Sequence, residues 1–389
     1  MLPLVHNRIS LQVPPMDAQT TTAGVPASTG VEIDAETVCQ NLTASTPAAS
    51  NPESAFRTSS RTQKLHGISI RGIGSALPED VVTNEDLKRN YGFDPEWIEK
   101  RTGIRERRRA AANDSTSSLA VRAAKAAISD AGISTTDIDL VVMGTFTPDY
   151  HCASSACLVQ HELDLDAAAF DVQAACAGFM YALSTAGQYV ATGNSQTALV
   201  IGADIMSRCA EPSDRTTAPL FGDGAGAVIV QAGGPEQGLL SYQLGADGRG
   251  ADLLYCPVGG SARPPEPHTV AAGDHFLKMD GRKVFKWAVQ TVADSIRVVL
   301  DHSGVSVDQV NLFVLHQANI RIIDHAMKDL GIPEHKVVNN LERVGNTSAA
   351  SIPLVLSEAN KAGRINSGDL VLMCGFGAGL TWGTGLFRW

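Results

Sequence analysis

The stretch FDVQAACAGF, residues 170–179, places Cys176 at the end of an apolar run and among very small residues. The run up to Val172 predicts a buried strand, and the apolar spacing from Gly178 to Thr192 predicts a helix. Cys176 is therefore expected at a strand-to-helix junction, where the positive end of the helix dipole favours the reactive thiolate. The alternative is a small, buried and inert cysteine, so residues elsewhere in the chain have to decide between the two.

Further strands and helices are predicted before and after this stretch. The apolar runs Leu140 to Met143 and Ala198 to Ile201 are typical of buried strands. Residues Ser117 to Gly132 have the apolar spacing of a helix that ends at a glycine. The alternation of helices and strands indicates a mixed α/β protein.

The chain contains an internal repeat. Residues 130–143 align with residues 302–315 at an offset of 172, and each copy is a helix end, a glycine, a short turn and an apolar strand. We therefore expect two α/β halves related by duplication. At the same offset Cys176 corresponds to Ser348, so a pseudo-twofold packing of the halves would bring Cys176 close to the loop around Asn346.

The domain boundaries follow from a change in composition. Residues 1–64 are rich in Thr, Ser, Ala and Pro and are expected to form a disordered extension, with Met16 as an alternative start. A transit peptide is the competing interpretation, and the acidic residues of this segment oppose it. The two halves are expected at residues 65–235 and 236–389.

The overall composition excludes several classes of protein. The 389-residue chain is 44% hydrophobic, like ordinary globular proteins, and its formal net charge of −10 argues against nucleic-acid binding. Its seven cysteines lack the spacing of a disulfide framework, which indicates a reducing compartment. No membrane span or secretory signal is recognised, so we expect a cytoplasmic protein that does not associate with membranes.

Two polar residues are candidate partners of Cys176. His316 follows the apolar strand Leu312 to Leu315, and Asn346 lies in a polar turn before a helix rich in small residues. Alone, His316 is more often a core histidine and Asn346 a helix cap. Together with Cys176 they form a set suited to nucleophilic catalysis.

Three competing interpretations are weaker. The sequence GDGAGA, residues 222–227, resembles a phosphate loop, but an apolar strand follows it where a dinucleotide site requires a helix. His151, Cys152, Cys157 and His161 lack standard zinc spacing, so no metal is expected. The serine-hydrolase motif Gly-x-Ser-x-Gly does not occur.

Six motifs are distributed along the chain. They are WIEKRTGI (97–104), AACAGF (174–179), FGDGAGA (221–227), HQAN (316–319), GNTSAA (345–350) and GFGAG (375–379). In combination they resemble those of β-ketoacyl-acyl-carrier-protein synthase III, the condensing enzyme that initiates bacterial fatty-acid synthesis. The resemblance extends from His66 to Trp389.

This resemblance implies a thiolase-like fold with an αβαβα arrangement of two duplicated halves, and a homodimer. The implied acyltransferase activity joins an acyl-CoA primer to malonyl-acyl-carrier protein by decarboxylative Claisen condensation, without a cofactor. Cys176 would be the nucleophile, with His316 and Asn346 completing the set. The backbone N–H groups of Cys176 and Ala378 would form the oxyanion hole.

The resemblance also implies where the substrates bind. Trp97 and Arg215 would flank the adenine of coenzyme A, Arg101 would lie near its phosphate, and Asn319 would line the pantetheine tunnel. For Trp97 alone core packing is the alternative, and for Arg215 a solvated turn.

An acidic carrier protein requires a basic surface on the enzyme. In the helix after Ile320, Arg321 and Lys328 are spaced to share one exposed ridge, and Lys286 matches another docking position of the family. A plain solvated helix face is the alternative interpretation. Cys152 replaces an aromatic residue that closes the acyl pocket in members that use short primers, so we expect a primer longer than acetyl.

Two other functions remain open at this point. A relative of the same family in secondary metabolism, forming polyketides, quinolones or esters, would carry the same three residues. An inactive binding subunit of the same fold is disfavoured because Cys176, His316 and Asn346 are all present.

Overall fold

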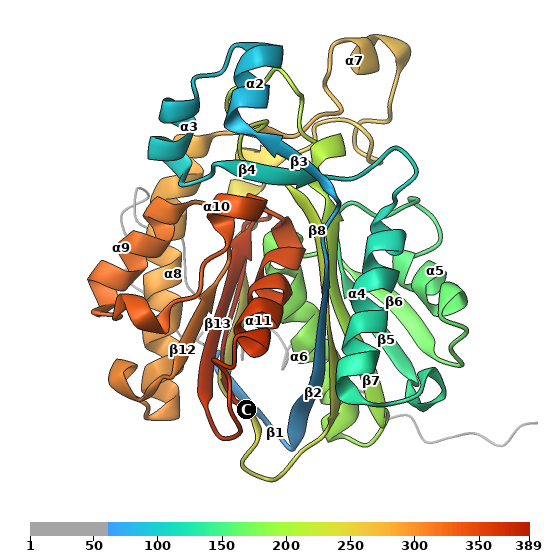
Figure 1. Ribbon diagram of the computed structural model, residues 1–389, viewed down its shortest axis with the longest axis vertical. Coiled ribbons are helices and arrows are strands. Elements are labelled where there is room, and N and C mark those ends of the chain that lie inside the picture. The colour runs from blue at the N-terminus through green and yellow to red at the C-terminus, as the bar shows by residue number, and fades with distance from the viewer. Residues whose placement is uncertain (1–60) are drawn as a thin grey trace, which may run out of the picture. The chain divides into compact units, whose positions relative to one another are not determined.

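The computed structural model describes residues 61–389, which contain two five-stranded sheets with helices between them and on their outer faces (Figure 1). The first sheet has the order β2-β8-β7-β5-β6, and the second has the order β1-β9-β14-β13-β12. The strands of the first are β2 (Ile68–Ala76), β5 (Leu140–Gly144), β6 (Ala168–Val172), β7 (Thr197–Ile205) and β8 (Asp223–Ala232). Those of the second are β1 (Gln63–His66), β9 (Gly238–Ala246), β12 (Leu312–Leu315), β13 (Leu370–Gly377) and β14 (Thr381–Arg388).

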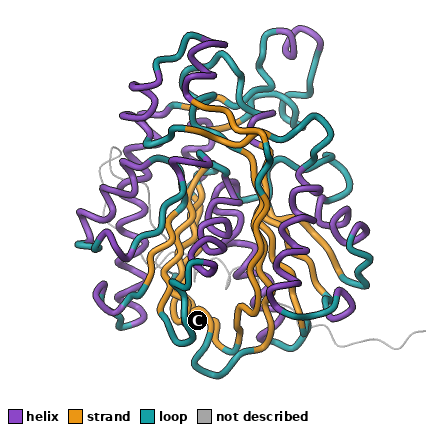
Figure 2. The backbone as a smooth tube through the Cα atoms, in the orientation of Figure 1, coloured by secondary structure: helices purple, strands orange, loops and turns teal. Residues whose placement is uncertain are grey.

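Helices complete a five-layer αβαβα arrangement, which confirms the expected fold class (Figure 2). The central layer holds α6 (Gly178–Ala191) and α11 (Ser351–Lys361), which contact both sheets. The first sheet is covered outside by α4 (Thr116–Ala131) and α5 (Ser155–Glu162), and the second by α8 (Gly281–Ser303) with α9 (Ile320–Leu330) packed on it.

Shorter elements cover one end of the sheets, where the chain leaves several strands (Figure 1). They include two small antiparallel sheets, β3 with β4 and β10 with β11. The elements are β3 (Asp80–Thr83), α2 (Asn84–Tyr91), α3 (Pro95–Thr102), β4 (Glu106–Arg109), β10 (Leu254–Tyr255), α7 (Pro267–Ala271), β11 (Lys278–Met279) and α10 (Leu341–Val344).

The predicted element boundaries are mostly confirmed. Helix α4 ends at Gly132, whose φ of 65° is a left-handed conformation that glycine adopts at little cost. The GDGAGA segment runs into β8 rather than into a helix, so it is a strand entry and not a phosphate loop. Within residues 61–389, no helix has both the length and the apolar character to cross a membrane.

The duplication is visible in the structure with one adjustment. The strands β5 and β12 begin 172 residues apart, but the helices α6 and α11 begin at Gly178 and Ser351, 173 residues apart. The 3₁₀ turns before them, Ala175–Ala177 and Ser348–Ala350, have the same offset of 173. Ser348 is therefore the counterpart of Ala175, and the predicted correspondence with Cys176 is wrong by one residue.

The first strand, β1, begins at Gln63, inside the segment that the sequence assigns to the extension. Of the expected extension, residues 1–60 lie outside the described part of the chain. Gln63 and Lys64 belong to β1, which pairs antiparallel with β9, so they are not part of a disordered segment. We propose to retain the division at 235/236, because apart from β1 each sheet draws its strands from one side of it.

Candidate active site

Cys176 lies in the 3₁₀ turn that joins β6 to α6, at the strand-to-helix junction predicted from the sequence. Its side chain is buried, with 7% of the residue exposed. The end of β13 passes close to it: a Cβ on Gly377 would lie 3.0 Å from the Cys176 sulfur. Glycine at 377 therefore makes room for the thiol.

Burial controls the ionisation of this thiol. Removal from water, with a smaller contribution from the nearby Asp204 carboxylate, raises the pKa of Cys176 to about 12 against a lowering by Ser348. The expectation that the helix dipole leaves a reactive thiolate is wrong for the free protein, because desolvation of the charge outweighs it. The raised pKa favours the protonated thiol over the thiolate at neutral pH.

His316 follows β12 and is almost fully buried, with 1% exposed. Its backbone N–H donates to Cys374 O at 2.8 Å, and its ring packs edge-on against Phe376 with centroids 5.1 Å apart. Nδ1 lies 2.6 Å from the Ser351 hydroxyl. Burial lowers the pKa of His316 to about 3, so the imidazole is neutral at physiological pH.

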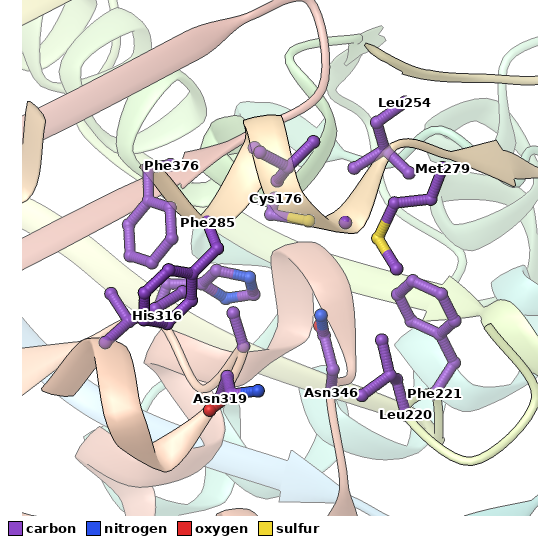
Figure 3. Close-up of a pocket in the computed structure, with 15 residues that line it drawn as sticks. Cys176, Leu220, Phe221, Leu254, Met279, Phe285, His316, Asn319, Asn346 and Phe376 are labelled. Atoms are coloured by element: carbon purple, nitrogen blue, oxygen red, sulfur yellow. The ribbon is translucent and has the colours of Figure 1, made fainter. Parts of the chain in front are cut away.

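Asn346 is fixed through both its backbone and its side chain. The backbone N–H donates to Leu220 O at 2.8 Å, and the backbone O accepts from Gly222 N at 3.0 Å. The side-chain Oδ1 accepts from the Ser348 N–H at 2.9 Å. Because this bond occupies the oxygen, the amide nitrogen is the group presented to the cavity, as Figure 3 shows.

These three residues line one cavity with about 600 Å³ of empty space (Figure 3). Cys176 comes from the first half of the chain, whereas His316 and Asn346 come from the second, so the duplicated packing brings them together as expected. The rest of the wall is largely apolar. It consists of Leu220, Phe221, Leu254, Met279, Gly281, Val284, Phe285, Ala318, Asn319, Ile322, Phe376 and Gly377.

The residues expected to bind coenzyme A lie at different depths. Asn319 lines the cavity, and its side-chain amide donates to Arg101 O at 3.1 Å. Trp97 and Arg101 are on α3 and exposed, and Arg215 is exposed in the loop that leads to Leu220. In the described residues Trp97, Arg101 and Arg215 do not line the cavity itself.

A shared apolar cluster connects α3 to the loop that carries Arg215. Ile98, next to Trp97, packs in this cluster with Ala218, and Asn319 holds the end of α3. The two expected adenine contacts thus belong to segments that pack on one another and continue to the cavity wall.

The expected docking ridge is exposed as predicted. Arg321, Lys328 and Lys286 all have exposed side chains. The Arg321 guanidinium lies 5.1 Å from the ring centroid of Phe285, a residue of the cavity wall. Arg321 therefore lies next to the cavity wall, and Lys286 follows Phe285 in α8.

Ala378 and Cys152 are the two other residues expected at the site. Ala378 directly follows Gly377, the glycine packed against Cys176, and its carbonyl accepts from the Thr381 hydroxyl at 2.8 Å. Cys152 is exposed in the loop before α5 and does not line the cavity within residues 61–389 of one chain. In the same residues, no group of three or more His, Cys, Asp or Glu side chains is arranged to hold a metal ion.

Sequence reasoning missed Ser351 and several apolar wall residues. Ser351 is 35 residues from His316 in the chain and follows the quoted motif GNTSAA, so no local pattern connects the two. Leu254 and Met279 belong to the small β10–β11 sheet, whose strands are only two residues long. Short strands of this kind leave no periodic signal in a sequence.

The duplicated αβαβα fold defines this protein as a thiolase-like enzyme. The sequence profile of 3-oxoacyl-[acyl-carrier-protein (ACP)] synthase III matches residues 170–248, and that of the C-terminal part of the same family matches residues 300–389. The β-ketoacyl-[acyl-carrier-protein] synthase III of Rhodopirellula baltica is 49% identical over 343 residues, covering 84% of this chain and 99% of that protein.

Solved structures give the same result. The 3-oxoacyl-(acyl carrier protein) synthase III of Pseudomonas aeruginosa has a TM-score of 0.77 and 40% identity, covering 83% of this chain and 98% of that one. The priming β-ketosynthase of a polyketide biosynthetic pathway has a TM-score of 0.77 and 37% identity, covering 84% of this chain and 98% of that one. The chain belongs to the β-ketoacyl-acyl-carrier-protein synthase III family, as the sequence motifs indicate.

Proposed function

We propose that this chain condenses an acyl-CoA primer with malonyl-acyl-carrier protein through Cys176, His316 and Asn346. The product is a β-ketoacyl-acyl-carrier protein, and the reaction initiates fatty-acid synthesis. The observation that carries the residue assignment is that the three side chains, drawn from both halves of the chain, line one cavity.

In the first half-reaction the Cys176 sulfur attacks the thioester carbonyl of the acyl-CoA. Nε2 of neutral His316 takes the thiol proton while its Nδ1–H donates to the Ser351 hydroxyl, and Nε2 then passes the proton to the leaving coenzyme A thiolate, so the enzyme ends as an acyl-cysteine. The Ser351 hydroxyl can donate to Nδ1 or accept from it, so it accommodates both protonation states of the ring. The backbone N–H groups of Cys176 and Ala378 stabilise the oxyanion.

In the second half-reaction malonyl-carrier protein loses carbon dioxide, and the electron pair of the broken C–C bond moves onto the thioester enolate. The Nε2–H of His316 and the amide nitrogen of Asn346 donate hydrogen bonds to the enolate oxygen. The enolate carbon then attacks the acyl-cysteine carbonyl, and the Cys176 thiolate leaves. Decarboxylation supplies the nucleophile, so the proposal includes no metal or redox cofactor.

The two substrates would reach the cavity through the same opening. Trp97 and Arg215 hold the adenine, Arg101 meets the phosphate and Asn319 contacts the pantetheine arm. Arg321, Lys328 and Lys286 bind the acidic carrier protein, and the contact of Arg321 with Phe285, a residue of the cavity wall, supports this part of the proposal. The carrier would thus deliver its prosthetic arm directly into the cavity.

We also propose a cytoplasmic homodimer. β6 is the edge strand of the first sheet, so its open side is available to a second copy of the chain. Beside it Tyr189 is 42% exposed and its ring packs on Phe170, with centroids 6.4 Å apart. Such an interface would let Cys152 of one copy approach the acyl pocket of the other. Sedimentation of the purified chain tests this, and a monomer at working concentration would refute it.

The decisive experiment measures carbon dioxide release from malonyl-carrier protein with and without an acyl-CoA primer. The wild type is expected to release carbon dioxide and form a β-ketoacyl product only when the primer is present. Cys176→Ser should lose product formation, whereas Cys256→Ser, at an exposed free cysteine, should retain it. Condensation by Cys176→Ser at the wild-type rate would refute the assignment.

The primer is tested separately. Cys152 in place of an aromatic residue favours an acyl group longer than acetyl, so mass spectrometry should show faster acylation of Cys176 by longer acyl-CoA chains. A strict preference for acetyl-CoA would refute this part of the proposal.

A role in secondary metabolism is the second candidate function. It is favoured by the likeness to a priming β-ketosynthase of a polyketide pathway, described above. The same purified enzyme distinguishes the two, because transfer of the acyl group to an amine, a hydroxyl or a β-keto acid in preference to malonyl-carrier protein would support the alternative.

A further inference from the structure

Asp204 is a completely buried carboxylate at the C-terminal part of β7, and the reaction proposed above gives it no role. Among residues 61–389 no Lys, Arg or His side chain forms an ion pair with it. A buried charge without a cation is costly unless hydrogen bonds replace its water shell. Its surroundings therefore require an explanation.

Hydrogen-bond donors from both halves of the chain surround this carboxylate. Oδ1 accepts from the hydroxyl groups of Thr145 and Thr147, both at 2.9 Å, and from the N–H groups of Phe146 at 2.9 Å and Thr147 at 3.1 Å. Oδ2 accepts from the Ala349 N–H at 3.1 Å. Backbone N–H groups can only donate, so this arrangement suits the ionised carboxylate and offsets the burial that raises the pKa of Asp204.

The bond to Ala349 reaches the turn that presents Asn346. This turn, Ser348–Ala350, begins with Ser348 at φ 52°, a conformation that residues other than glycine adopt at a cost. The Ser348 N–H donates to Oδ1 of Asn346. The next N–H along the chain, that of Ala349, donates to Oδ2 of Asp204. A Cβ on Gly202 would lie 2.3 Å from Ala349 O, so β7 and the turn are in close contact.

We infer that Asp204 is a positioning residue, which anchors the Ser348–Ala350 turn to the first half of the chain and thereby keeps the Asn346 amide nitrogen directed at the thioester oxygen. The inference rests on the role proposed for Asn346. Asp204 acts through the turn and does not touch the reacting atoms.

The effect of Asp204 on the pKa of Cys176 distinguishes a positioning role from a role in activating the thiol. In its ionised form Asp204 raises the pKa of Cys176 and so opposes thiolate formation. His316, the other titratable group of the cavity wall, is neutral and contributes no charge. Neutralising Asp204 should therefore make the thiol more reactive and at the same time impair the step that depends on Asn346.

The test compares Asp204→Asn with Asp139→Asn. Asp139 precedes β5 and accepts from the N–H groups of Gln196 and Thr197. It therefore links the starts of β5 and β7, whereas Asp204 links the C-terminal ends of the same two strands. For Asp204→Asn we expect malonyl-carrier decarboxylation to fall about 10- to 100-fold, mainly in kcat. Alkylation of Cys176 by iodoacetamide at a fixed, mildly alkaline pH should become faster. Asp139→Asn should change neither rate.

A double-mutant cycle decides whether the effect passes through Asn346. In an Asn346→Ala background, Asp204→Asn should cause little further loss of decarboxylation, because the group that it positions is gone. Fully additive losses, equal losses in the Asp139→Asn control, or slower alkylation would overturn the inference. Decarboxylation at the wild-type rate by Asn346→Ala alone would instead refute the role proposed for Asn346.

A milder variant covers the case in which Asp204→Asn does not fold. Thr145→Val preserves shape and removes one hydroxyl donor to Oδ1, while the Thr147 N–H keeps its bond to the carboxylate. A smaller decarboxylation loss that disappears in the Asn346→Ala background supports the inference, and an undiminished loss in that background overturns it.

Discussion

The Ser351 hydroxyl lies 2.6 Å from Nδ1 of His316, at the first residue of α11. The Gln317 N–H approaches the same oxygen at 3.5 Å, which favours Ser351 as the donor to Nδ1. With Nδ1 accepting, the proton of the neutral ring is on Nε2. This is the tautomer that can donate to an enolate oxygen in the cavity, whereas acylation uses the other tautomer, in which Nδ1–H donates to the Ser351 hydroxyl.

Removing this hydroxyl should therefore weaken decarboxylation. Ser351→Ala leaves Nδ1 buried without a hydrogen-bond partner. An unpaired buried acceptor costs about 1–3 kcal/mol of free energy, so we expect the rate of malonyl-carrier decarboxylation to fall about tenfold. Ser357→Ala is the matched control, because Ser357 is on the same helix and pairs with Ser75 away from the cavity. Equal rates for the two variants would contradict the assignment.

The reactivity of Cys176 toward iodoacetamide should rise with pH without a plateau in the neutral range. Burial raises the pKa of its thiol to about 12, so below that pH the thiolate fraction grows about tenfold per pH unit. Burial also lowers the pKa of His316 to about 3, so no inflection from this histidine is expected between pH 5 and 9. A plateau already present at pH 7 would indicate a preformed thiolate–imidazolium pair instead.

Charge reversal at the docking ridge should separate the two substrates. Arg321→Glu with Lys328→Glu is expected to raise KM for malonyl-carrier protein about tenfold, with an effect that shrinks at high salt. Self-acylation of Cys176 by acyl-CoA should remain close to that of the wild type. Lys125→Glu with Lys361→Glu, at exposed lysines of α4 and α11, is the control because it changes the net charge by the same amount. Equal loss of both half-reactions would show that the ridge does not bind the carrier.

A methyl group at residue 377 should block the nucleophile. The Cβ of Gly377→Ala would lie 2.8 Å from the Cys176 Cβ and 3.0 Å from its sulfur, closer than non-bonded carbon and sulfur atoms pack. We expect loss of acylation in mass spectrometry and a decrease of about 1–3 kcal/mol in the free energy of unfolding. Gly248→Ala, where an added Cβ meets nothing within 4 Å, should retain both properties.

The sequence predicted well what depends on local pattern. The strand, turn and helix around Cys176, the glycine that ends α4 and the strand before His316 are where periodicity and capping residues place them. The same patterns could not fix the ionisation of Cys176. Burial raises the pKa of its thiol, and that burial depends on segments distant in the chain, such as the one that carries Gly377.

The sequence by itself determined the duplicated α/β architecture and the family, because a repeat of 172 residues and six motifs are properties of residue order. Only the tertiary structure decided which groups contact the residues proposed for catalysis and the turn beside them. Ser351 meets His316 across 35 residues, and Asp204 meets Ala349 across 145. Such contacts arise where the two sheets and the central helices pack together, since packing sets which buried donor faces which acceptor.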